Sequence, residues 1–218
     1  MHSRGKVNAA GEELAQMLLW SAAFDDDVLA LLEYGWNVSS PRLAICMALC
    51  KAAVEHAVSQ RVLVQAGLHG TALSLIRLHF ETVVRAVWVQ HGASDDWLVK
   101  FTTPIPDGVL YEPQMGPPIP SMLDAIKIQV PEAARELGRL NETMKVMHSF
   151  VHGGAHLVVH ALRGYPPEKM VAVLQNRNFL SLMLTNVIVF ASQQPKLRGA
   201  VRHLMEQHAS CMPPHGSV

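Results

Sequence analysis

Two arginines and a glutamate stand at four-residue spacing in one segment, a pattern that could bind an anion. Arg77, Glu81 and Arg85 fall on one side of a helix, within an arc of roughly 80° that also takes in Ser74 and Trp88. Arginine offers a planar fork of donors to a phosphate, and Glu81 could hold one fork in place. Two arginines against one glutamate leave a positive surplus, and Trp88 could add a stacking face. The segment predicts an anion or phosphate site.

The same spacing has a structural interpretation that the sequence leaves open. The three charges border the apolar stripe of the expected helix, where a charge needs either a partner or a task. An ion-pair ladder that fixes helix packing would explain the spacing as well as an anion site does.

A second segment places histidines along one edge of another expected helix. Asn141, His148 and His152 lie together beside its apolar stripe, and His152 stands directly before Gly153-Gly154, where the helix has to end. A histidine there could act as general acid or base near neutral pH, or it could only interact with the dipole of the helix end. If the two edges meet in one bundle, arginines and histidines converge on one polar pocket.

The histidines at 148, 152, 156 and 160 also have a spacing that could place metal ligands on one helical face. The double glycine breaks that face after His152, and no carboxylate lies at ligand spacing. We therefore predict no metal site and no cofactor. Nucleophilic triads, phosphate-binding glycine loops and dinucleotide fingerprints are absent from the sequence, which leaves open whether the protein is an enzyme.

These segments belong to a chain in which almost every stretch has the 3.6-residue period of a helix. Proline-rich residues 102–120 are expected to form an ordered loop or a flap, and residues 210–218 a flexible tail. The pattern predicts an all-α fold, an antiparallel bundle of about seven helices in one domain over 1–218. Helices are expected over 11–34, 41–66, 70–90, 121–128, 131–152, 166–192 and 195–209, with a short amphipathic piece at 95–101 and an ambiguous one at 156–162.

Composition restricts the possible partners and location. Eighteen basic residues balance eighteen acidic ones, so no overall field recruits nucleic acid or an anionic membrane, and no DNA sequence recognition is evident. The longest apolar stretch, 179–191, is too short and too polar to span a bilayer, and the start lacks the apolar core of a signal peptide. We expect a cytoplasmic protein. Half of the residues are apolar and only 17% are charged, which favours self-association as a homodimer.

Two motifs carry a resemblance that covers roughly residues 10–195. They are Gly70-x4-Leu75-Ile76-Arg77-x3-Glu81-x3-Arg85-Ala86-x-Trp88 and Phe150-Val151-His152-Gly153-Gly154. Together they resemble a family of uncharacterised bacterial helical proteins, similar in layout to the HEPN superfamily (higher eukaryotes and prokaryotes nucleotide-binding). That resemblance implies a helical bundle, and many active HEPN proteins are dimeric, metal-independent ribonucleases of toxin–antitoxin or phage-defence systems. Their hallmark is an arginine followed four to six residues later by a histidine. Here Arg85 and His91 have that spacing, whereas the basic residue at that distance before His152 is Lys145.

Two functions are compatible with these patterns. In the first, an HEPN-like pocket binds a nucleotide or RNA, and His152 supplies proton transfer if the protein is a ribonuclease. Its ligand-binding residues would be Arg77, Glu81, Arg85, Trp88, Asn141 and His148. In the second, the protein is a non-catalytic homodimeric interaction protein whose buried charges are structural. A solvent-open pocket favours the first, and a dry ion-pair ladder favours the second.

Overall fold

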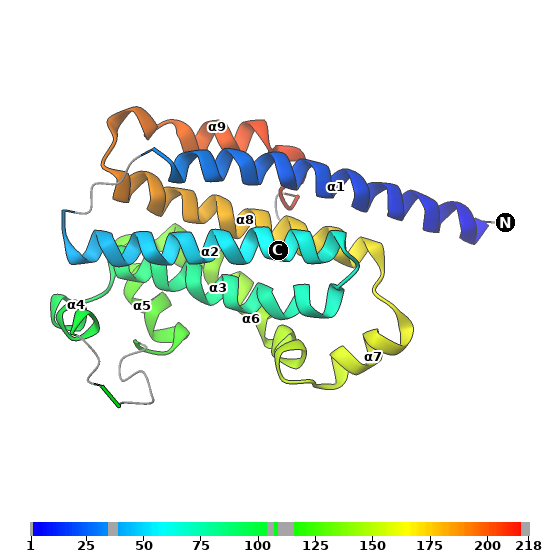
Figure 1. The fold of residues 1–218 in the computed structure, drawn as a ribbon, viewed down its shortest axis with the longest axis horizontal. Helices are drawn as coiled ribbons and strands as arrows, with labels where there is room; N and C mark the ends of the chain where they lie inside the picture. Colours follow the sequence, from blue (N-terminus) through cyan, green and yellow to red (C-terminus); the bar gives the residue numbers. More distant parts are fainter. Residues whose placement is uncertain (1, 35–38, 104–106, 109–115, 215–218) are drawn as a thin grey trace.

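Nine α-helices make up most of the described part of the chain in the computed structural model, which covers residues 2–34, 39–103, 107–108 and 116–214 (Figure 1). No strand occurs among these residues, so the all-α prediction is confirmed. The helices are α1 (His2–Leu32), α2 (Pro41–Gln65), α3 (His69–His91), α4 (Asp95–Thr102), α5 (Ile119–Gln129), α6 (Pro131–Val151), α7 (Ala155–Arg163), α8 (Pro167–Ser192) and α9 (Ala200–Gln207), with short 3-10 helices η1 (Pro195–Leu197) and η2 (Ala209–Cys211).

The number of helices exceeds the expected seven because two short stretches are also helical. The expected amphipathic piece forms α4, which begins after Ser94, whose Oγ accepts a hydrogen bond from the Trp97 N–H at 3.2 Å. The ambiguous stretch forms α7, directly after Gly154. Both helices span only two to three turns, too few for periodicity to identify them, so a cap or a preceding turn becomes the better signal.

Some boundaries also differ from the prediction. Helix α1 begins at His2 rather than at Gly11. The last expected helix is interrupted at Gly199, so η1 and α9 take its place. Most of the predicted flap at 102–120, and the end of the predicted tail at 215–218, lie outside the described residues.

Capping and proline signals fix the helix starts near the places that the sequence indicates. At the start of α2, the Leu43 N–H donates to Ser40 Oγ at 3.3 Å, and Pro41 occupies the first helical position. Gly67 follows α2 with a φ of +75°, a conformation that favours glycine and turns the chain into α3. Pro131 and Pro167 open α6 and α8 in the same way as Pro41 opens α2.

Helix α3 lies at the centre of the bundle. It packs against α2 and α8 on one side and against α5 and α6 on the other, while α1 and α9 lie beyond α8 (Figure 1). His79 and Gln90 are polar residues on the side of α3 opposite the charged arc, a position from which exposure to solvent would be expected. Both side chains are instead buried, His79 completely, because α2 and α8 cover that side.

Candidate functional site

Helices α3 and α6 meet, and their contact brings the arginine segment to the histidine segment. Ser74 Oγ donates to the Phe150 carbonyl at 2.9 Å, and one turn further along α3 the Arg77 guanidinium reaches His148. Residue numbers rise along one helix as they fall along the other, so the two helices are antiparallel. The hypothesis that these two edges converge is therefore confirmed for Arg77 and His148.

Arg77 is held from two directions. Its Nε donates to Glu81 Oε1 at 2.7 Å, and its NH1 lies 2.6 Å from His148 Nδ1. A guanidinium can only donate, so Nδ1 must be the acceptor, and the hydrogen of a neutral His148 ring sits on Nε2. The ion pair is partly open to solvent, since the side chains of Arg77 and Glu81 are 33% and 31% exposed.

The turn between α6 and α7 positions His152 beside this chain of contacts. The His152 ring is exposed, and its centroid lies 4.1 Å from that of His148. Gly153 adopts a φ of +68°, and the Gly154 N–H donates to the Ser149 carbonyl at 2.7 Å, which closes the helix end. The same Ser149 then caps α7, because its Oγ accepts from the His156 N–H at 3.0 Å. As predicted, α6 ends immediately before the double glycine.

Gly154 and Gly70 allow the close packing that this turn requires. A Cβ on Gly154 would lie 2.6 Å from Ser149 Oγ, and one on Gly70 would lie 2.9 Å from the Tyr165 hydroxyl. Glycine at these two positions lets the start of α3 and the α6–α7 turn approach their neighbours.

Arg85 lies on the same face of α3 as Arg77, two turns further along the helix. Arg85 is eight residues after Arg77, and α6 runs in the opposite direction from His148. Arg85 therefore lies at about the level of Asn141, which is half-buried. The Arg85 side chain is half-buried too, and its Nε is buried without a hydrogen-bond partner. No carboxylate among the described residues forms an ion pair with it, while Glu81 is engaged by Arg77. The positive surplus inferred from the sequence is therefore a property of this face.

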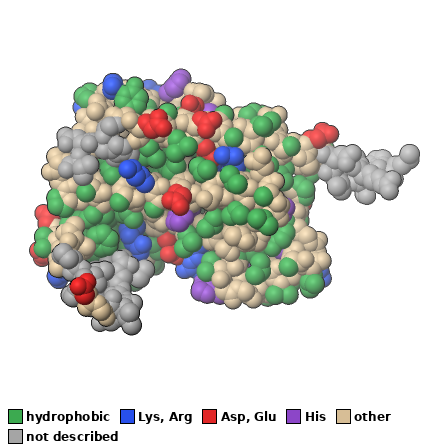
Figure 2. All heavy atoms as spheres, in the orientation of Figure 1, with side chains coloured by type: hydrophobic (Ala, Val, Ile, Leu, Met, Phe, Trp, Pro, Cys, Tyr) green, Lys and Arg blue, Asp and Glu red, His purple; other side chains and the backbone are tan. Residues whose placement is uncertain are grey.

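We call Arg77, Glu81, Arg85, His148 and His152 the α3–α6 edge. In Figure 2, basic, acidic and histidine side chains gather around a hollow in the surface, between the ends of the molecule that carry α4 and α7 in Figure 1. A ligand could reach side chains in such a hollow without unfolding of the bundle.

Trp88 lies inside the core. It is 4% exposed, and its ring makes an edge contact with Trp97 at a centroid distance of 4.6 Å. Trp97 in turn stacks on Phe101 at 4.7 Å. The ring of Trp88 could stack on a ligand only after this aromatic cluster rearranged.

A second group of charges, which sequence reasoning missed, lies in the core between α1, α2 and α8. Arg177 is fully buried and forms an ion pair with Asp25, whose other oxygen accepts from Arg61 Nε at 2.7 Å. Arg177 also donates to the Ala57 carbonyl at 2.9 Å and to the side chain of Asn178. Burial lowers the pKa of Arg177, and the Asp25 carboxylate opposes that shift. We call Asp25, Arg61, Arg177 and Asn178 the buried cluster.

One sequence signal could have revealed the buried cluster. Asn176-Arg177-Asn178 interrupts an otherwise apolar stretch of α8, and a charge inside such a helix requires a buried partner. The sequence does not say which carboxylate supplies it, because Asp25 stands in a run of three aspartates.

His79 lies close to this cluster without a hydrogen-bond partner. It is completely buried, and neither ring nitrogen has a partner. Burial lowers the pKa of His79 well below 6.5, and the charges of Arg177 and His56 lower it further. The folded protein therefore keeps His79 neutral at pH 7.

His160, Cys46 and Cys50 have structural surroundings. His160 stacks between Phe150 and Tyr165, at centroid distances of 6.0 and 5.3 Å. Burial raises the pKa of Cys46 to about 12 and that of Cys50 well above 9.0, so both thiols stay protonated. Across the described ranges, no three histidine, cysteine, aspartate or glutamate side chains come together as a metal site.

Within the described part of the chain, no helix is both long and apolar enough to cross a bilayer.

Comparison with known proteins gives a match to one family model. No curated protein and no solved structure matches the sequence. The chain belongs to a family of unknown function (DUF6988), which matches residues 50–214.

Proposed function

We propose that this protein is a cytoplasmic, HEPN-like protein that binds a phosphate-bearing ligand, a nucleotide or RNA, at the α3–α6 edge. The arrangement of Arg77 carries the proposal. Glu81 and His148 hold its guanidinium at 2.7 and 2.6 Å while a third of the side chain stays exposed. A guanidinium oriented in this way at the surface presents its remaining N–H donors to an incoming anion at little cost in side-chain entropy.

The charge of the α3–α6 edge supports an anionic ligand. Arg77 and Arg85 carry two positive charges against the single negative charge of Glu81. Arg85 forms no ion pair with a described carboxylate, and a phosphate is a suitable anionic partner for its guanidinium. Both arginines lie on one face of α3, so one phosphate or two neighbouring phosphates could engage them.

With RNA as the ligand, the same residues suit metal-independent cleavage. His152 would take the proton of the 2′-hydroxyl, whose oxygen attacks the adjacent phosphorus. The bond from phosphorus to the 5′-oxygen would break, which leaves a 2′,3′-cyclic phosphate, and the 5′-oxygen would take up a proton from water. Arg77 and Arg85 would stabilise the negative charge that develops on the phosphorane. His148, with its hydrogen on Nε2, would donate to a phosphate oxygen. The HEPN-like layout proposed from the two motifs agrees with this chemistry.

Binding is tested with fluorescence anisotropy on labelled single-stranded RNA, and with thermal shifts on mono- and triphosphate nucleotides. We expect Arg77→Ala and Arg85→Ala each to weaken binding at least about tenfold, the equivalent of about 1.4 kcal/mol for one charge-assisted hydrogen bond. Arg202→Ala is the matched control, because it removes the same charge from the exposed surface of α9. Wild-type protein that binds no nucleotide or RNA, or losses equal to that of Arg202→Ala, would contradict the proposal.

Catalysis is tested separately from binding. His152→Ala should still bind RNA but no longer cleave it, whereas Arg85→Ala should lose binding and cleavage together. His156→Ala is the matched control, since His156 is also an exposed histidine of the α6–α7 region. Cleavage that survives in His152→Ala would remove His152 from the reaction and leave the binding proposal in place.

One observation favours the alternative function, a non-catalytic homodimeric interaction protein. Helix α7 buries none of its residues, and Val158, Val159 and Leu162 are 51%, 43% and 83% exposed. A row of exposed apolar residues on one helix is typical of a surface that binds another protein. Under this alternative, sedimentation velocity should show a dimer that Leu162→Glu dissociates, and no ligand should bind the α3–α6 edge.

A further inference from the structure

A cavity of about 390 Å³ lies between α3, α6 and α8, on a different flank of α3 from Arg85. Val87 lines this cavity and stands two residues after Arg85, which places the two side chains about 160° apart around the helix axis. The cavity and the α3–α6 edge are therefore separate features of the molecule.

Apolar side chains form most of the cavity. Val87 of α3 and Val187 of α8 are buried at 4% and 2% exposure. The other apolar residues of the lining are only half-buried, so they retain apolar surface that a ligand could cover. They are Val130, Ala133, Phe179 and Met183. The volume and the apolar lining are typical of small-molecule sites, which range from about 300 to 1,000 Å³.

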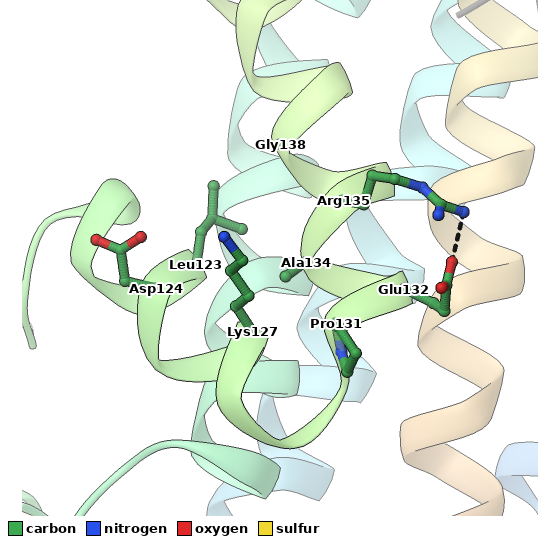
Figure 3. A pocket seen from close by; sticks show the side chains of 8 residues that line it. All are labelled: Leu123, Asp124, Lys127, Pro131, Glu132, Ala134, Arg135 and Gly138. Carbon is green, nitrogen blue, oxygen red and sulfur yellow. Dashed lines mark ion pairs between the residues drawn. The ribbon is translucent and has the colours of Figure 1, made fainter.

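The charged residues around the cavity already have partners. Arg135 forms ion pairs with Glu132 and Glu136, and Figure 3 shows the pair with Glu132 on the side of α6 that faces α8. Glu136 also forms an ion pair with Arg139, at 3.2 Å. Two carboxylates and two guanidiniums therefore offset each other, and no charge is left over for an ionic ligand.

Two polar side chains that line the cavity carry no charge. Burial lowers the pKa of His91 below 6.5, so its ring is neutral at pH 7 and offers one donor and one acceptor. Asn186 is exposed, and its amide makes one hydrogen bond to the described residues, a long one of 3.5 Å to the Met183 carbonyl. Both residues can bond a polar group on a ligand.

We propose that this cavity binds a small neutral ligand that is mostly apolar and carries one hydrogen-bonding group. The apolar lining would cover the body of the ligand, and His91 or Asn186 would bond its polar group. An ionised ligand would lose its hydration without gaining a counter-charge, so the cavity should reject it. The proposal does not depend on the function proposed for the α3–α6 edge.

A neighbouring cavity of about 490 Å³, between α5 and α6, has a different lining (Figure 3). Lys127 extends along it from α5, and Asp124 lies on the same helix. These charged residues distinguish it from the cavity at His91, although the two cavities share Glu132 and Arg135.

The test uses two fluorescent probes with one skeleton, neutral N-phenyl-1-naphthylamine and its anionic counterpart 8-anilinonaphthalene-1-sulfonate. With the full chain at pH 7.5, we expect saturable one-to-one binding of the neutral probe with enhanced, blue-shifted emission. The sulfonate should bind at least tenfold more weakly. Ala133→Phe, which places a ring in the cavity, should weaken binding of the neutral probe at least tenfold.

Two further variants make the result specific. Ala172→Phe is the matched control, because it adds the same ring to an exposed position of α8 that does not line the cavity. Asn186→Trp obstructs the cavity from an exposed position, so it tests the proposal even if Ala133→Phe does not fold. Arg85→Ala should leave the affinity for the neutral probe unchanged.

Three results would overturn the proposal. They are the absence of saturable binding of the neutral probe, equal affinity for the sulfonate, and equal binding in Asn186→Trp and Ala172→Phe. None of these results bears on RNA binding at the α3–α6 edge, so the two proposals fail independently.

Discussion

The buried cluster and the α3–α6 edge use the same residue types in opposite surroundings. In the buried cluster, the side chains of Arg177 and Asp25 are 0% and 4% exposed, and α1, α2 and α8 enclose them. At the α3–α6 edge, the paired Arg77 and Glu81 are 33% and 31% exposed. The first arrangement excludes water from an ion pair, whereas the second leaves an ion pair at the surface.

This difference separates two roles for arginine. A buried ion pair contributes little net stability, but removal of one partner is very costly, because the other charge stays buried and unpaired. A partly exposed pair has little effect on stability and stays available to other ligands. The dry ion-pair arrangement considered for Arg77, Glu81 and Arg85 therefore exists in this protein, but in the buried cluster.

The largest effect is expected for Asp25→Asn, which removes the shared carboxylate charge of the buried cluster. Arg61 and Arg177 would then face each other without a counter-charge, and the free energy of unfolding should fall by roughly 3–5 kcal/mol. Urea denaturation at pH 7 measures the change. Asp26→Asn is the control, since Asp26 is exposed and its loss should change stability by less than about 0.5 kcal/mol. Equal effects of the two variants would show that the buried pair is not critical.

Burial of a neutral His79 should make the free energy of unfolding depend on pH, with a smaller effect than that of Asp25→Asn. Its pKa is well below 6.5 in the folded protein, so the unfolded chain binds more protons once the pH drops below that value. Stability should therefore fall on acidification from pH 6.5, by up to about 1.4 kcal/mol per pH unit, until the pH reaches the folded pKa. Denaturation curves at pH 7.5, 6.5 and 5.5 measure this slope.

Two variants test whether His79 causes this pH dependence of stability. His79→Gln has no titrating ring, so its stability should depend less steeply on pH between 6.5 and 5.5 than that of the wild type. His156→Gln changes an exposed histidine and should keep the wild-type slope. An unchanged slope in His79→Gln would mean that His79 is not the group that resists protonation.

Periodicity and helix-end signals sufficed for the fold class. Ser40-Pro41 and the double glycine at 153–154 mark helix ends that the structure has at those places. The convergence of Arg77 and His148 was only a hypothesis from the sequence, based on the position of each residue beside an apolar stripe that packs in a bundle. The contact between the two side chains agrees with it.

The surroundings of individual side chains were much less predictable. Trp88 shares the charged arc of α3, yet its ring packs against Trp97 of α4, a contact that no local pattern specifies. Likewise, 152 residues separate Asp25 from Arg177 in the sequence, so only the tertiary fold identifies them as partners. Spacing along one helix specifies which residues share a face, but not which neighbour covers that face.

The smallest effect on stability is expected at the α3–α6 edge, and it distinguishes this edge most directly from the buried cluster. Arg77→Ala and Glu81→Ala should each lower the free energy of unfolding by less than about 1 kcal/mol, because their ion pair is partly exposed. A double-mutant cycle in urea should give a coupling of about 0.5 kcal/mol, typical of pairs four residues apart on a helix. Arg77→Ala should nevertheless abolish most ligand binding. A coupling near the 3–5 kcal/mol expected for the buried cluster would instead make the pair a packing element and remove the main support for an anion site.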